Sequence, residues 1–92
     1  MLKLEFTTRM KKDMKRLQRQ GKDMDKLQAV LEILASGVNL PQKYRDHALS
    51  GQLKGQRECH VEPDWLLIYM VDRGMLVLTA MASGSHAELF KM

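Results

Sequence analysis

The chain has 92 residues, of which 45% are hydrophobic and 28% charged, so it fits a single globular domain spanning residues 1–92. No apolar run approaches the ~18 residues needed to cross a bilayer, and no signal-peptide pattern opens the chain, which argues against a membrane protein. The lone Cys59 cannot close an internal disulfide, so a cytoplasmic location fits better than secretion.

The positive charge is concentrated at one end of the chain. Residues 1–26 contain nine Lys or Arg and four acids, whereas residues 27–92 contain six and seven. This distribution favours a polyanionic partner such as a nucleic acid, although a basic helix face can also serve solubility alone. The cationic side chains that we expect to bind RNA are Lys11, Lys12, Lys15, Arg16 and Arg19.

The first half of the chain predicts one strand followed by two helices. Residues 2–6 alternate apolar and polar side chains, which is typical of a strand with one buried face. Thr7 or Thr8 can cap the next helix, which Gly21 ends, and Asp23 can cap a second helix, which Gly37 ends. The short connection makes the two helices an antiparallel hairpin. The apolar positions expected to face the core are Met10, Met14, Leu17, Leu27, Val30, Leu31 and Leu34.

The second half predicts three strands. Residues 55–62 form a strand that Pro63 ends, residues 65–71 are apolar on both faces like a central strand, and residues 75–82 complete a β-hairpin. Residues 85–90 close the chain as a helical turn or a strand end. The expected fold class is α/β of the α+β type, in the order β-α-α-β-β-β. The helix hairpin would cover one face of a mostly antiparallel four-stranded sheet, leaving the opposite face for function.

Three histidines and one aspartate are the groups that could carry acid–base chemistry. His47 precedes the last three strands, His60 lies near a strand end, and His86 follows the last strand, so the three can converge on one rim of the sheet. Asp64 stands four residues after His60 and can tune a neighbouring imidazole. Each histidine alone also fits a structural role. We predict no metal site, because the sequence lacks the usual ligand spacings and adjacent Cys59 and His60 are poorly placed to bind one ion together.

Three segments resemble the YafQ-like toxins of the RelE/ParE superfamily, which belong to bacterial type II toxin–antitoxin systems. The segments are "KDMDKLQAVLEIL", "YRDHALSGQLKGQRECHVEPDWLLIY" and "GSHAELF". They carry the pattern DH-x-L-x-G, then HVEPDW-x-L-I-Y, then G-[ST]-H-A-x-L-F, and the resemblance covers almost the whole chain. The resemblance implies a RelE-like fold, in agreement with the element order above.

The resemblance also implies a function in the bacterial cytoplasm. The chain would be a ribosome-dependent endoribonuclease, an mRNA interferase that cleaves messenger RNA in the A site without cofactor or metal and so inhibits translation. Its partners would be the ribosome with its 16S rRNA, the messenger, and a DinJ-like antitoxin. The implied reaction is attack of a ribose 2′-hydroxyl on the adjacent phosphate. The implied catalytic residues are His47, His60, Asp64 and His86, with Trp65 and Phe90 in the same pocket. Either Asp64 or His60 would act as the base, and His86 as the acid.

The sequence departs from the family pattern at one pair of positions. The family usually carries Arg-Thr before the G-[ST]-H motif, where this chain has Ala82-Ser83. An arginine there would stabilise the growing charge on the phosphate, so Ala82 predicts impaired cleavage. The alternative function is that of a ParE-like toxin that inhibits DNA gyrase by binding. The clustered histidines favour the nuclease, because a pure binder does not need titrating groups.

Overall fold

The computed structural model describes residues 1–90, and it confirms the predicted fold class and the helix hairpin on a mostly antiparallel sheet. None of the helices in this range is long and apolar enough to cross a membrane. The elements, in chain order, are β1 (Lys3–Phe6), α1 (Thr8–Arg19), α2 (Met24–Ala35), η1 (Gln42–Tyr44), β2 (His47–Ala48), η2 (Gly51–Leu53), β3 (Arg57–Glu62), β4 (Trp65–Asp72), β5 (Val77–Gly84) and α3 (His86–Phe90).

The sheet has five strands in the order β1-β5-β4-β3-β2, one strand more than predicted. β1 runs parallel to β5, and the other neighbours are antiparallel. The additional strand, β2, has two residues and pairs His47 with Glu58. The sequence does not predict β2, because two residues contain no alternation that could be recognised. The added strand matters because it brings His47 to the sheet.

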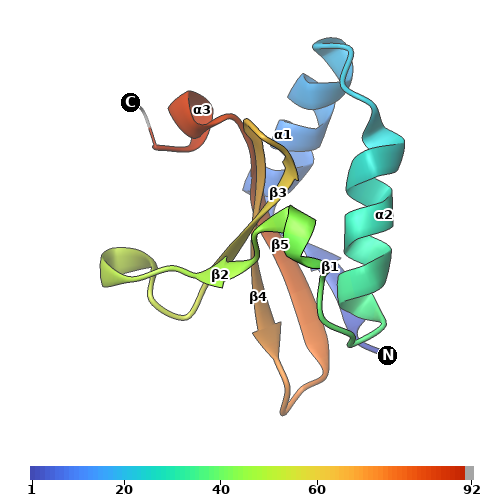
Figure 1. The fold of residues 1–92 in the computed structure, drawn as a ribbon, viewed down its shortest axis with the longest axis vertical. Coiled ribbons are helices and arrows are strands. Elements are labelled where there is room, and N and C mark those ends of the chain that lie inside the picture. The colour runs from blue at the N-terminus through green and yellow to red at the C-terminus, as the bar shows by residue number, and fades with distance from the viewer. Residues whose placement is uncertain (91–92) are drawn as a thin grey trace.

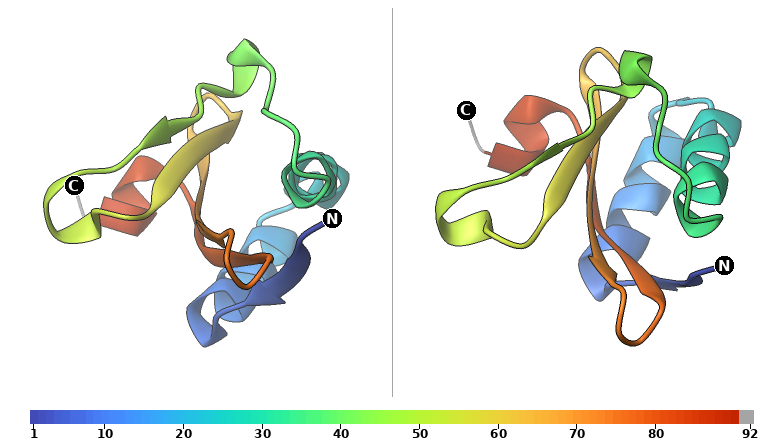
Figure 2. Two further views of the ribbon diagram at one scale, coloured as in Figure 1. Left: turned by 90° about the horizontal axis from the view of Figure 1, so that it is seen from below. Right: turned by 60° about the horizontal axis from the view of Figure 1, so that its bottom comes forward.

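The helices begin and end where their capping residues predict. The Thr7 hydroxyl accepts a hydrogen bond from the amide of Met10 at 2.9 Å, and the Asp23 carboxylate accepts one from the amide of Asp25 at 3.1 Å. Gly21 follows α1 with a φ of 80°, a left-handed conformation that suits glycine. α2 and α3 lie on opposite sides of the sheet (Figures 1 and 2). The hydrophobic core fills the space between the sheet and the two long helices.

The edge of β5 beyond the end of β1 is completed by side chains from the start of the chain. β1 pairs with β5 only as far as Phe6 and Ala80. Past that point the Thr7 hydroxyl donates to the carbonyl of Met81 at 2.7 Å, and the amide of Ser83 donates to the Asp13 carboxylate at 3.0 Å. Asp13 is only 2% exposed, and it also accepts from Arg16 Nη1 at 2.7 Å. These contacts attach the start of the chain and α1 to the last residues of β5.

We predict that Asp13→Ala destabilises the protein much more than Arg9→Ala does. Loss of the buried carboxylate leaves the amide of Ser83 and the guanidinium of Arg16 without their partner, at a cost of about 2–4 kcal/mol. Arg9 contacts the same carboxylate but is 53% exposed, so its loss should cost about 1 kcal/mol or less. Urea unfolding of the two variants measures the difference. Equal losses of unfolding free energy in the two variants would contradict the structural importance of Asp13.

Candidate functional site

Two rows of side chains cross the face of the sheet that points away from α1 and α2. Strand pairing places His47, Glu58, Ile68 and Ala82 in one row and His60, Leu66 and Gly84 in the next. Cys59 and Tyr69 belong to the core beneath the helices, and side chains alternate along a strand. Their neighbours Glu58, His60 and Ile68 therefore face the other way. The site is thus built on paired strands, which give these side chains a rigid support.

Glu58 is a buried carboxylate between two histidines. The Nε2 atoms of His47 and His60 each lie 3.5 Å from Glu58 Oε1. The Nδ1 atoms of the same rings lie 2.8 Å from the carbonyl of Arg45 and 3.2 Å from that of Pro63. A carbonyl can only accept, so each Nδ1 carries a hydrogen and each Nε2 is directed at the carboxylate. Both imidazoles therefore have a fixed orientation toward Glu58.

Sequence analysis did not identify Glu58 as a site residue. The strand alternation in the sequence could have identified it, because Glu58 stands two residues before His60 in a predicted strand. Two such side chains lie on the same face of the sheet. Its burial was the information that only the structure could supply: Glu58 is 6% exposed.

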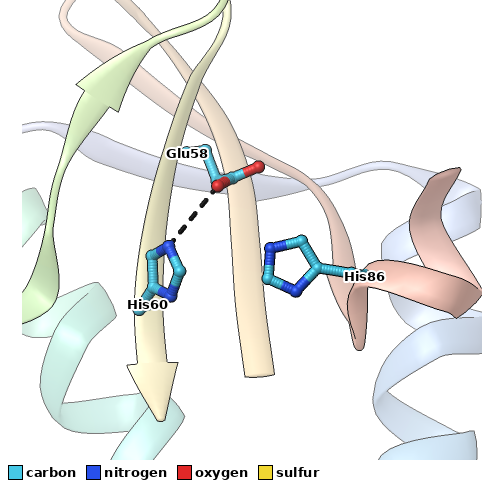
Figure 3. A group of neighbouring side chains, drawn as sticks. All are labelled: Glu58, His60 and His86. Atoms are coloured by element: carbon cyan, nitrogen blue, oxygen red, sulfur yellow. Dashed lines mark ion pairs between the residues drawn. The ribbon is translucent and has the colours of Figure 1, made fainter. Parts of the chain in front are cut away.

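Asp64 orients the third histidine. Asp64 Oδ1 lies 2.7 Å from His86 Nδ1 and accepts a hydrogen bond from the amide of His86 at 3.1 Å. Both hydrogen bonds lower the pKa of Asp64 below its ordinary value, and the bond from the amide has the larger effect. With Nδ1 engaged, Nε2 of His86 is free to face His60, whose ring centroid lies 5.9 Å away. Figure 3 shows the two imidazoles beside Glu58.

The two aromatic residues expected in the pocket have different outcomes. Phe90 in α3 lies near the cluster, with its ring centroid 6.4 Å from that of His86. Trp65 is 1% exposed and packs in the core, and its exposed edge lines a pocket that also includes Asp64. Its neighbour Leu66 shares the row of His60, so Trp65 must face the helices, where its Nε1 donates to Ser83 Oγ at 2.9 Å.

Glu88 fixes α3, and with it His86, against the end of α1. Its carboxylate accepts from the amide of Ser85 at 2.9 Å and from Gln20 Nε2 at 2.8 Å, and it lies 3.1 Å from Arg16 Nε. The Arg16 Nη2 atom also donates to the carbonyl of Ser83 at 2.7 Å. A Cβ on Gly84 would come within 2.5 Å of that nitrogen, which explains the glycine between Ser83 and Ser85.

The position of Arg16 corrects its assignment to the RNA-binding set. Its guanidinium is engaged by Asp13, Ser83 and Glu88, and its side chain is 27% exposed. It is therefore a structural residue that joins α1 to the end of β5 and to α3. The remaining members of the set are exposed on α1: Lys11, Lys12, Lys15 and Arg19.

Ala82 lies in the row of Glu58, two strands away, and is 8% exposed. It is buried outside the core cluster beneath the helices. Neighbouring strands lie about 4.8 Å apart, so Glu58 is within the reach of an arginine side chain at this position. The position that departs from the family pattern therefore belongs to the site face.

Glu58, His60 and His86 form a group that could hold a metal ion. One ligand atom from each lies within 4.8 Å of the others. Two imidazole nitrogens and one carboxylate oxygen suit zinc or copper. Cys59, the other ligand considered from the sequence, faces the core, and burial raises the pKa of its thiol to about 12. The structure therefore brings together three possible metal ligands whose spacing in the sequence did not indicate a metal site.

A family model described as "Bacterial toxin of type II toxin-antitoxin system, YafQ" matches residues 2–91. The chain belongs to the YafQ family of toxins. It is 41% identical over 88 residues to the mRNA interferase toxin YafQ of Escherichia coli strain K12, a match that covers 95% of this chain and 94% of that toxin.

Two solved structures extend this likeness to the fold. The YafQ-family chain matches a chain of the crystal structure of the E. coli DinJ-YafQ complex with a TM-score of 0.90 and 38% identity, over 98% of this chain and 99% of that one. It matches the crystal structure of a metal-bound toxin from Helicobacter pylori with a TM-score of 0.92 and 42% identity, over 98% and 100% of the two chains. The RelE-like fold expected from the sequence is confirmed.

We predict that α3 of this YafQ-family toxin stays docked at neutral pH and detaches only in acid. The folded structure lowers the pKa of Asp64 and of Glu88, chiefly through bonds from the amides of His86 and Ser85, from ordinary values of 3.8 and 4.5. Groups with depressed pKa values stabilise the fold above their ordinary pKa, and this contribution disappears as the pH falls through the folded pKa. The helical Cα chemical shifts of residues 87–90 should persist down to about pH 5 and move toward random-coil values below about pH 4. Detachment of α3 near pH 6, with the sheet intact, would contradict this.

Proposed function

We propose that this toxin is a ribosome-dependent mRNA interferase that acts in the bacterial cytoplasm. The observation that carries the proposal is the orientation of His60 and His86, which turn their Nε2 atoms toward the same space beside Glu58. Two imidazoles so placed can remove one proton and supply another in a single displacement. The E. coli relative named as an mRNA interferase toxin supports the same reaction class.

In the proposed mechanism His60 is the base and His86 the acid. His60 Nε2 takes the proton of a ribose 2′-hydroxyl, and the resulting oxygen attacks the adjacent phosphorus. The bond to the 5′-oxygen of the next nucleotide breaks, and His86 Nε2 gives that oxygen a proton. The products are a 2′,3′-cyclic phosphate and a 5′-hydroxyl end. Asp64 is a poor base because its pKa is lowered, so we assign it the role of orienting His86.

The proposed partners are those of the family. The DinJ-YafQ complex of E. coli supports a DinJ-like antitoxin for this chain, and the positive charge of residues 1–26 favours an acidic one. For the ribosome we propose contacts to 16S rRNA through the exposed cations of α1. These are Lys11, Lys12, Lys15 and Arg19. His47, beside Glu58 at the edge of the sheet, would be the third imidazole near the messenger.

We predict that Ala82→Arg increases messenger cleavage by about 10²–10³, because one donor aimed at transition-state charge is typically worth that factor. Ala82→Lys should recover less, since it lacks the planar fork that binds two phosphate oxygens. The assay maps messenger 5′ ends after incubation with translating ribosomes. His60→Gln in the Ala82→Arg background is the control and should cleave nothing. If Ala82→Arg is inert while inhibiting gyrase supercoiling, the ParE-like alternative replaces the nuclease.

We further propose that a zinc or copper ion can bind at Glu58, His60 and His86. The arrangement of the three ligand atoms supports this, as does the metal-bound relative from H. pylori. A bound ion would occupy the Nε2 lone pair of both histidines, the atoms to which the mechanism assigns proton transfer. Metal binding and cleavage would therefore exclude each other.

We predict that Zn²⁺ or Cu²⁺ inhibits cleavage by the Ala82→Arg variant and that a chelator restores it. Glu58→Gln should weaken metal binding by roughly tenfold or more in isothermal titration calorimetry, since it loses a charged ligand. His47→Gln is the matched control, because His47 touches Glu58 but is not in the ligand group. Stimulation of cleavage by the metal would instead indicate a catalytic ion.

A further inference from the structure

A groove of about 460 Å³ lies directly beside the catalytic cluster, between η1, the end of β3 and α2. His60, the residue assigned as base, forms part of its wall, so the groove and the cluster share one side chain. The volume falls within the ~300–1,000 Å³ typical of ligand sites. The other lining residues that matter here are Lys26, Lys43, Tyr44, Arg45 and Glu62.

The groove combines an aromatic ring with two cations that have no carboxylate partner among the described ion pairs. Tyr44 is half-buried and packs against the core, and Lys43 Nζ lies 5.0 Å from its ring centroid. Lys43 and Arg45 are exposed. Lys26 and Glu62, by contrast, are paired at 2.7 Å, which raises the pKa of the lysine and lowers that of the glutamate. The net positive charge of the groove therefore comes from Lys43 and Arg45.

We propose that this groove binds the ribonucleotide that flanks the scissile phosphate, an inference that rests on the proposed nuclease function. The base stacks on the ring of Tyr44, displacing the ammonium of Lys43, which then pairs with the neighbouring phosphate together with Arg45. Stacking on an aromatic side chain beside backbone-binding cations is the general way in which proteins hold single-stranded RNA. The RNA strand then passes over His60 to the group of Glu58, His60 and His86.

The segment that carries this subsite is anchored before any RNA binds. The carbonyl of Arg45 lies 2.8 Å from His47 Nδ1, and Asp46 is held by Arg57 and by the hydroxyl of Tyr69. A preformed site loses less conformational entropy on binding. The same loop thus connects the proposed base-binding residue, Tyr44, to the catalytic face through His47.

The test is NMR titration of the ¹⁵N-labelled protein with a trinucleotide whose central ribose is 2′-deoxy, which removes the attacking hydroxyl. We expect shifts at residues 43–45 and 60–63. Tyr44→Leu keeps apolar bulk against the core but removes the ring, and it should raise the Kd by about tenfold or more. Tyr44→Phe keeps the ring and should bind within about twofold of the parent protein. Thermal melting confirms that both variants are folded.

A charge series tests the phosphate contacts. Lys43→Gln should reduce the slope of log K against log salt by about 0.7, the value for one phosphate of a single strand. Arg45→Asn should weaken binding without backbone strain, because Arg45 has a φ of 52° and asparagine tolerates that conformation. Lys3→Gln is the matched control, since β1 lies at the opposite edge of the sheet from β2. It should change neither the salt slope nor the Kd.

The outcomes separate this inference from the proposed function. Shifts confined to α1, or an unchanged Kd for Tyr44→Leu, would overturn the subsite even if Ala82→Arg cleaves messenger. If the trinucleotide binds in the groove but Ala82→Arg never cleaves, the nuclease function fails and the groove remains an RNA-binding site.

Discussion

The buried carboxylate of Asp13 is the contact on which the position of the site depends. β5 extends past the end of β1. The backbone groups of the last residues of β5 therefore need hydrogen-bond partners from another element. Asp13 accepts from the amide of Ser83 and from Arg16, and Arg16 in turn reaches the carbonyl of Ser83 and the carboxylate of Glu88. Because Glu88 also binds the amide at the start of α3, one acid in α1 sets where His86 stands.

The sheet separates stability from chemistry by the alternation of its side chains. Cys59 of β3 packs beneath the helices, whereas Glu58 and His60 lie on the opposite face of the sheet. Two register irregularities adjust this pattern, one after His60 and one between Ile68 and Tyr69. Bulges at such places re-aim side chains without ending a strand. The second lets Ala80 pack in the core while Ala82 joins the site row.

The features that follow from local rules can be predicted from this sequence, whereas those that follow from burial and distant contacts cannot. The caps Thr7 and Asp23 and the period-2 strands act within a few residues, so the helices, the hairpin and the fold class were accessible. The predicted convergence of the histidines also agrees with the structure, in which three rings lie in a chain of contacts. The role of Arg16 depends instead on Ser83 and Glu88, which are far along the chain. The burial of Glu58 depends on the packing of the folded protein, and the inward face of Trp65 depends on strand register.

Ala82 lies on the site face and outside the core that supports the fold. Leu66, Ile68 and Ala82 are buried, yet they lie outside the cluster that the helices cover. Because position 82 lies outside that core cluster, an arginine side chain there would add little to the core, and its absence should remove little stability. Arg16 is the opposite case, because its three partners belong to the framework and none to the substrate. Arg16 therefore belongs to the framework that positions His86, whereas Lys11, Lys12, Lys15 and Arg19 lie exposed on the surface of α1.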